Sequence, residues 1–131
     1  MTQIKAKNAS AEKDPLTQKI IGCAYKVHSA LGPGFNECVY HNAFKLALEG
    51  GRISFETEKG FGVQFEGRRV GGLRVDLIVE EKVIVEVKAV TGNIPKVFES
   101  QLLSYLRVSG CRVGLIVNFG NDRCQVKRLV N

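Results

Sequence analysis

The sequence lacks any apolar run close to the ~20 residues that a membrane-spanning helix requires. Residues 1–13 are polar, so they also lack the apolar block of a secretory signal, and we expect them to form a flexible tail. Both absences favour a soluble, cytoplasmic protein without a membrane partner. Hydrophobic residues still make up 44% of the chain, a normal share for one globular domain, which we predict to span residues 14–131.

Close pairs of cysteines are also absent, which argues against a zinc knuckle. Without an export signal, free thiols in a reducing cytosol are expected instead of disulfides. Neither His28 nor His41 has a partner at metal-ligand spacing, so structural roles are favoured for both histidines. The four cysteines are spread along the chain as Cys23, Cys38, Cys111 and Cys124.

Acidic residues are the minority among the charged ones, with 13 Asp and Glu against 19 Lys and Arg and a net charge of +6. A basic surplus favours a polyanionic partner, because contacts to phosphates release counterions. Many basic domains carry such a charge only for solubility. The surplus therefore supports a nucleic-acid partner only in combination with a site that acts on phosphates.

Three segments show the helical spacing of apolar residues, and they are predicted at residues 15–31, 36–48 and 96–108. Asp14, directly before a proline, is a suitable N-cap for the first helix, and Asn36 is a suitable cap for the second. The apolar positions of the second helix include Val39, Phe44 and Leu48.

Six segments show strand patterns and are predicted at residues 52–58, 61–66, 70–79, 83–89, 112–118 and 124–130. Lys59-Gly60 is predicted to form the turn between the first two strands, and residues 80–82 the turn between the third and fourth. Strands that alternate with helices in this way predict a mixed sheet with helices packed on it, which is an α/β fold.

Aspartate is scarce, with only three in the chain, and Asp76 occupies an unusual place. It lies in the middle of the β-prone segment 73–79, where aspartate is disfavoured. Glu86 and Lys88 interrupt the next β-prone segment, residues 83–89, in the same way. Three ionisable groups in two such stretches indicate a site.

The register of the two strands decides whether these groups meet. A three-residue loop at 80–82 pairs Val79 with Val83 and places Asp76 directly opposite Glu86, with Cβ atoms ~5 Å apart. A two-residue loop would shift the pairing by one residue and separate the two acids, so we predict the three-residue loop. The apolar residues would then point together to the other face: Val75, Leu77, Val79, Val85 and Val87.

Two facing carboxylates at ~5 Å repel by about 3 kcal/mol at an effective dielectric constant of ~20 if both are charged. A shared proton, a counter-ion such as Lys88 or Arg74, or a bridging divalent cation can offset this cost. Mg²⁺ suits the last alternative, because it takes one or two carboxylates, keeps waters and binds substrate phosphates. Lys88 could then orient a water for attack on phosphorus. An ordinary ion-pair cluster on an exposed sheet face fits the spacing equally well.

The pattern of Asp76, nine further residues and then Glu86-Val87-Lys88 resembles the bipartite motif of the PD-(D/E)XK nuclease superfamily. Val75 stands where the name of the superfamily has proline. A second signature, GFNECVY at residues 34–40, resembles the name motif of the GxxExxY protein family, a branch of that superfamily. The resemblance extends over roughly residues 16–130.

The resemblance implies a restriction-endonuclease-like mixed β-sheet flanked by helices, with an αβββαβ core, an extra N-terminal helix and a C-terminal strand. It implies that Asp76 and Glu86 are the main metal ligands, that Glu37 is an additional acidic ligand, and that Lys88 is the catalytic lysine. Mg²⁺ or Mn²⁺ is the implied cofactor. Glu37 also has a structural interpretation, since a carboxylate in the first turn of a helix interacts favourably with the helix dipole.

Three further residues are candidates for substrate binding. Gln101 and Tyr105 resemble the Gln-x-x-x-Tyr element of the RecB-like nucleases, and a spacing of four places them on one helical face. Tyr40 closes the signature at residues 34–40, although a core aromatic with a solvated hydroxyl is the alternative. Gln101, in turn, can be an ordinary surface residue.

The leading hypothesis is therefore a Mg²⁺- or Mn²⁺-dependent nuclease that hydrolyses phosphodiester bonds, with DNA favoured over RNA as the nucleic acid. The alternative is a catalytically silent nucleic-acid-binding or protein-interaction module with the same fold. A homodimer whose two sites cut opposite strands is a further hypothesis, because the chain is small for binding a duplex alone.

Overall fold

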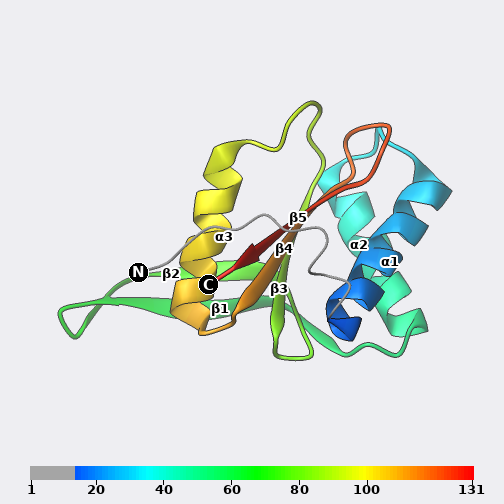
Figure 1. Cartoon of the computed structure of the whole chain (residues 1–131). Coiled ribbons are helices and arrows are strands. Elements are labelled where there is room, and N and C mark those ends of the chain that lie inside the picture. Colours follow the sequence, from blue (N-terminus) through cyan, green and yellow to red (C-terminus); the bar gives the residue numbers. More distant parts are fainter. Residues whose placement is uncertain (1–13) are drawn as a thin grey trace.

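A five-stranded sheet forms the centre of the structure, a computed structural model that describes residues 14–131 (Figure 1). The order of the strands in the sheet is β1-β2-β3-β4-β5. The expected tail at residues 1–13 lies outside the described residues. The elements are α1 (Pro15–Leu31), α2 (Glu37–Gly50), β1 (Phe55–Phe65), β2 (Arg68–Val79), β3 (Val83–Lys88), α3 (Lys96–Ser109), β4 (Val113–Asn118) and β5 (Gln125–Val130).

The sheet is mixed, because β3 and β4 are parallel and the other three pairs of neighbours are antiparallel. Helix α3 makes the crossover that two parallel neighbours require. From α2 to β4 the order is αβββαβ, preceded by α1 and followed by β5. This confirms the restriction-endonuclease-like fold class.

The helix caps match the sequence prediction, but the buried face of α2 is shifted. The Asp14 carboxylate accepts hydrogen bonds from the Thr17 N–H (3.3 Å) and hydroxyl (2.6 Å), and the Asn36 side chain accepts one from the Val39 N–H (3.2 Å). Val39 is 36% exposed, so this apolar position of α2 lies at the surface. Tyr40 takes its place, because a repeat of four from residue 40 leads to the buried residues Phe44 and Leu48.

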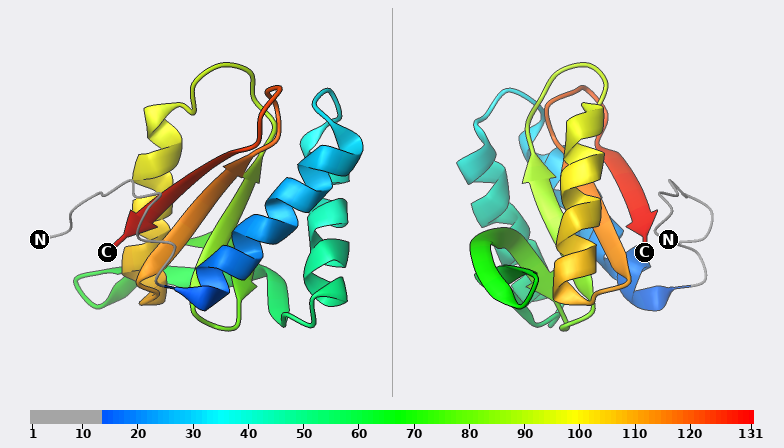
Figure 2. Two further views of the ribbon diagram at one scale, coloured as in Figure 1. Left: turned by 45° about the vertical axis from the view of Figure 1, so that its right-hand side comes forward. Right: turned by 90° about the vertical axis from the view of Figure 1, so that its left-hand side faces the viewer.

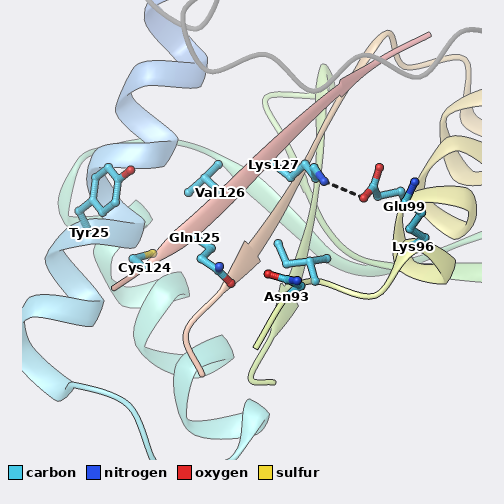
Figure 3. A pocket seen from close by; sticks show the side chains of 9 residues that line it. Tyr25, Asn93, Lys96, Glu99, Cys124, Gln125, Val126 and Lys127 are labelled. Carbon is cyan, nitrogen blue, oxygen red and sulfur yellow. Dashed lines mark hydrogen bonds and ion pairs between the residues drawn. The ribbon is translucent and has the colours of Figure 1, made fainter. Parts of the chain in front are cut away.

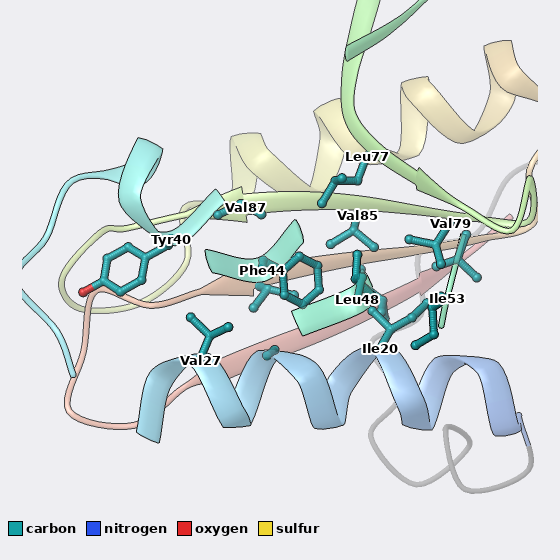
Figure 4. Packing of buried hydrophobic residues seen from close by; sticks show 14 of the residues in the cluster. Ile20, Val27, Tyr40, Phe44, Leu48, Ile53, Leu77, Val79, Val85 and Val87 are labelled. Carbon is teal, nitrogen blue, oxygen red and sulfur yellow. The ribbon is translucent and has the colours of Figure 1, made fainter. Parts of the chain in front are cut away.

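Helices cover both faces of the sheet, with α1 and α2 on one face and α3 on the other (Figure 2). The larger apolar cluster lies between the sheet and the pair α1 and α2 (Figure 4). It includes Ile20, Phe44, Leu77, Val79, Val85 and Val87. A second cluster packs under α3 and includes Val75, Ile78, Ile84, Leu102 and Leu106. Val75 was predicted to share the face of Leu77, and this prediction was wrong.

The cause is a reversal in the hairpin formed by β1 and β2. The predicted turn at Lys59-Gly60 does not form, and β1 continues through it as far as Phe65. The ladder of pairs omits Glu58 and Asp76, and Glu58 has a left-handed backbone with φ of 52°. Beyond this point the side chains exchange faces, so that Val75 joins the α3 cluster. Asp76 lies at the reversal itself.

The loop between β2 and β3 confirms the predicted register, since Val79 pairs with Val83. Glu80 and Glu81 both adopt positive φ values, 54° and 57°, without glycine. The Glu80 carboxylate accepts hydrogen bonds from the Ser54 N–H (2.8 Å) and hydroxyl (3.0 Å), which hold the loop against the start of β1. The register that brings the two acids together is therefore fixed by this loop.

Two smaller points complete the fold. The thiols of all four cysteines are free. Within residues 14–131, no helix is long and apolar enough to cross a membrane.

Candidate functional site

The carboxylates of Asp76 and Glu86 lie together at the place where β2 and β3 stop pairing through their backbones. The last backbone pair joins Leu77 and Val85. Next to it, the Asp76 N–H donates to Glu86 Oε2 (2.9 Å), and the Val87 N–H donates to Asp76 Oδ2 (2.9 Å). The two side chains thus satisfy backbone groups that the ladder leaves open. Each acid is fixed by the other strand, and the predicted proximity is confirmed.

Glu86 is a buried acid with an unusual proton affinity. Its exposed fraction is only 5%, and this burial raises its pKa, together with the negative charge of Asp76, to about 8. The hydrogen bond from the Asp76 N–H and the charge of Lys88 oppose the rise. At neutral pH the pair therefore requires either a proton on Glu86 or a nearby cation.

Glu37 is the first residue of α2 and is exposed at the surface. Partial desolvation raises its pKa, and the charge of Asp76 adds to the rise, whereas Lys88 and His41 lower it. Glu37 is thus within electrostatic reach of the other predicted site residues. Among residues 14–131, however, no three His, Cys, Asp or Glu side chains are grouped so that they could hold a metal ion. The preformed part of the site is the pair Asp76 and Glu86.

Lys88 is the last residue of β3, and its ammonium group lies over an aromatic ring of α3. Its Nζ atom is 4.5 Å from the centre of the Phe98 ring, a cation–π contact that restricts the position of the charge. Sequence reasoning did not select Phe98. The available signal was its helical spacing, three residues before Gln101 and seven before Tyr105.

Tyr105 and Gln101 lie one turn apart on α3 but differ in their surroundings. Tyr105 is partly buried, and its pKa is raised by burial and then by the negative charges of Glu86 and Asp76. Tyr105 is therefore close enough to the two acids for their charges to act on its hydroxyl. Gln101 is exposed.

Tyr40 is fully buried and holds the loop that precedes α2. Its hydroxyl donates to the Gly32 carbonyl oxygen (2.6 Å) and accepts from the Phe35 N–H (3.2 Å). Its ring stacks on Phe119 with centroids 4.8 Å apart, and the Phe119 N–H donates to the Lys88 carbonyl oxygen (2.9 Å). These contacts favour the core interpretation of Tyr40, in which it connects the start of α2 to the end of β3.

Asn118 is a buried residue that sequence reasoning missed, and it fixes the chain that follows Lys88. Its side-chain amide accepts from the Val90 N–H and donates to the Val90 carbonyl oxygen, both at 2.9 Å. Asn118 Oδ1, which accepts from the Val90 N–H, also accepts from the Gly120 N–H (3.2 Å). A polar residue at the end of the apolar strand 113–118 was the signal that could have indicated it.

A groove of about 620 Å³ lies elsewhere, between α1, β5 and the segment before α3 (Figure 3). Its polar lining includes an ion pair in which Lys127 Nζ is 2.8 Å from Glu99 Oε2. None of the predicted site residues lines it. The acidic pair, which lies where β2 and β3 separate, is therefore not part of this groove.

The acidic pair suits a hard divalent cation by its chemistry. Carboxylate oxygens are the ligands that Mg²⁺ and Mn²⁺ prefer. The burial that raises the pKa of Glu86 is a cost that a cation between the two acids would offset. Asp76 and Glu86 are the two residues that could hold such an ion.

The raised pKa predicts how the stability of the metal-free protein depends on pH. Folded Glu86 keeps a proton that the unfolded chain releases, so this group stabilises the fold fully below about pH 4.5 and progressively less as the pH rises to about 8. The expected loss from this group is about 3 kcal/mol in the free energy of unfolding by pH 7. Urea unfolding at several pH values measures it. Saturating Mn²⁺ should abolish the decrease, and equal slopes with and without Mn²⁺ would contradict the prediction.

Comparisons with known proteins agree on the fold. A family model described as "PD-(D/E)XK nuclease superfamily" matches residues 14–129. The solved structure "Crystal structure of SSO0001" is similar with a TM-score of 0.55 and 16% sequence identity over 94% of this chain. This chain covers 60% of the length of that protein. A search of curated proteins gave no match.

Proposed function

The chain belongs to the PD-(D/E)XK nuclease superfamily, and from this premise we propose that it is a divalent-metal-dependent nuclease that hydrolyses phosphodiester bonds. The observation that carries the proposal is the reciprocal pair of Asp76 and Glu86, fixed at the point where β2 and β3 separate. Nucleic acid is the substrate class that the superfamily implies. The signature at residues 34–40 supports a narrower assignment to the GxxExxY family.

In this proposal Asp76 and Glu86 bind Mg²⁺ or Mn²⁺, with Glu37 as a more distant acidic partner. When bound, the ion supplies the positive charge that activates a water and stabilises charge on the scissile phosphate. The protein fixes the two acids by hydrogen bonds to backbone groups, so they need little rearrangement on binding.

Lys88 contributes a second positive charge next to the acids. Its ammonium group, held over the Phe98 ring, can orient the attacking water and stabilise the negative charge that develops on the phosphate. Tyr105, beside the carboxylates, can donate a hydrogen bond from its hydroxyl. Gln101, exposed one turn away, can contact the nucleic acid strand.

Substitution of Asp76 or Lys88 tests this proposal directly. We expect Asp76→Ala and Lys88→Ala to lower the cleavage rate by about 10²–10⁴-fold, because each removes a group that stabilises the transition state. The cleavage assay incubates each protein with single- and double-stranded DNA and then RNA, in the presence of Mg²⁺, Mn²⁺ or EDTA. Light scattering of the same samples shows whether two copies associate, as cutting both strands of a duplex by a dimer would require.

The matched control is Lys82→Ala, which removes an exposed charge from the loop between β2 and β3. It should leave cleavage unchanged. Cleavage by Asp76→Ala and Lys88→Ala at the wild-type rate would show that these roles are wrong. If the wild type binds nucleic acid but cleaves none of the four substrates, and calorimetry detects no Mn²⁺ binding that depends on Glu86, the silent binding module is correct instead.

A further inference from the structure

The outer half of the hairpin formed by β1 and β2, residues 59–74, extends beyond the other strands of the sheet (Figure 1). We call it the basic arm. It holds four basic residues and one acidic residue, which gives +3 of the chain's net charge of +6. These residues are Lys59, Arg68, Arg69, Arg74 and Glu66. Half of the net positive charge of the protein is thus gathered on one projecting segment.

Arg69 lies flat on a floor of glycine in this arm. The register of the hairpin shifts by one residue between Val63 and Gln64, which turns Arg69 to the face of Gly62 and Gly72. A Cβ atom at Gly72 would lie 2.8 Å from Nη2 of Arg69, and one at Gly62 would lie 3.2 Å from Nη1. The guanidinium therefore occupies space that any other residue at these positions would fill.

The Arg69 side chain is also available for a ligand. Among residues 14–131, its guanidinium makes no ion pair or hydrogen bond. Arg74, which is nearer to Asp76 along β2, forms an ion pair in which its Nη1 is 3.5 Å from Glu58 Oε1. Arg69 and Arg74 line the same hollow of about 480 Å³ together with the glycines. The floor of the hollow is glycine backbone, and its charged groups are the two arginines. A phosphate could therefore approach the guanidinium groups closely.

The hollow and the acidic pair are connected along the chain by β2. Arg74 is two residues before Asp76, and Arg69 is seven residues before it, which is about 23 Å of extended chain. One strand of a duplex advances about 3.4 Å per nucleotide, so a strand bound at the acidic pair would have a phosphate near Arg69 about seven nucleotides away. The distance suits one continuous strand in contact with both places.

We propose that the basic arm binds the phosphate backbone of the nucleic acid, with Arg69 as its main contact. This inference rests on the proposed function, because it takes the substrate of the acidic pair to be nucleic acid. The planar guanidinium donates two parallel hydrogen bonds to phosphate oxygens, and the glycine floor presents it already oriented. The arm contacts backbone and not base edges, so it contributes affinity without sequence preference.

The test is the affinity of a fluorescein-labelled 20-nucleotide DNA, single- or double-stranded, measured by anisotropy in EDTA so that no cleavage occurs. We expect Arg69→Ala to weaken binding about tenfold and to reduce the salt dependence by about one phosphate contact. Arg112→Ala is the matched control. It removes an exposed arginine beside the start of β4, at the opposite end of the sheet from Lys88, and should change the affinity less than about twofold.

Gly72→Ala gives a second measurement. Its Cβ would lie 2.8 Å from the movable tip of Arg69 and 3.2 Å from the Phe61 carbonyl oxygen, so the arginine must move away and the hairpin backbone must shift by a few tenths of an ångström. The substitution should weaken binding in the wild-type background but not in Arg69→Ala. If Arg69→Ala binds the DNA as tightly as the wild type, the proposed role of the basic arm is wrong, even if Asp76-dependent cleavage is observed. Arg69-dependent binding without any cleavage supports the arm and overturns the proposed nuclease activity.

Discussion

Glu86→Gln is expected to abolish metal-dependent cleavage while raising the thermal stability of the metal-free protein at pH 8. Glutamine has the shape of the protonated acid and can still accept the hydrogen bond from the Asp76 N–H. It cannot ionise, so the variant avoids the cost of a buried charge that burial and Asp76 impose on Glu86. The same change removes one of the two proposed anionic ligands, and several kcal/mol of lost charge stabilisation corresponds to a rate loss of about 10³-fold or more.

The size of the stability change depends on pH, which makes the prediction specific. At pH 5 the wild-type Glu86 is protonated in the folded state, so the two proteins should unfold at nearly equal temperatures. At pH 8 the variant should be more stable, because only the wild type loses a proton on unfolding. Differential scanning calorimetry in EDTA measures both values. Glu49→Gln, on the exposed side of α2, is the control, and it should alter neither stability nor cleavage. A variant less stable than the wild type at pH 8 would contradict the account of Glu86.

Local rules were sufficient to predict the acidic pair. A side-chain period of two and a three-residue loop fix the register of β2 and β3, and both depend on residues close together in sequence. The caps at Asp14 and Asn36 were predictable for the same reason, since each cap contacts a residue three positions later. The roles of the site residues stay predictions, because they depend on a reaction.

Features that depend on contacts between distant segments were not predictable. The reversal at Glu58 places a non-glycine residue at positive φ inside a long strand. It depends on the pairing of β1 with β2, because Glu58 and Asp76 are the two residues that the ladder omits at this point. It moved Val75 to the face of α3, against a simple alternation. Phe98 likewise became part of the site only because α3 packs across the end of β3 and brings its ring to Lys88.

Gly120→Ala is the substitution expected to destabilise the fold most strongly. A Cβ atom at Gly120 would lie 2.2 Å from the Val90 carbonyl oxygen and 2.5 Å from the Val90 carbonyl carbon and nitrogen. Two backbone segments must then separate, and the paired hydrogen bonds between Asn118 and Val90 stretch or break. We expect a loss of about 3 kcal/mol or more in the free energy of unfolding, and a fall of roughly 10 °C in the unfolding temperature.

Gly22→Ala is a control with the opposite expected sign. Gly22 lies within α1 with no atom in the way of a Cβ, so alanine should stabilise the helix by about 0.5–1 kcal/mol. Unfolding in urea measures both variants, and an unchanged midpoint for Gly120→Ala would show that the two segments separate freely. Because Val90 lies only two residues after Lys88, the folded fraction of Gly120→Ala should also cleave more slowly than its stability accounts for, as its lysine would no longer be held beside the acids.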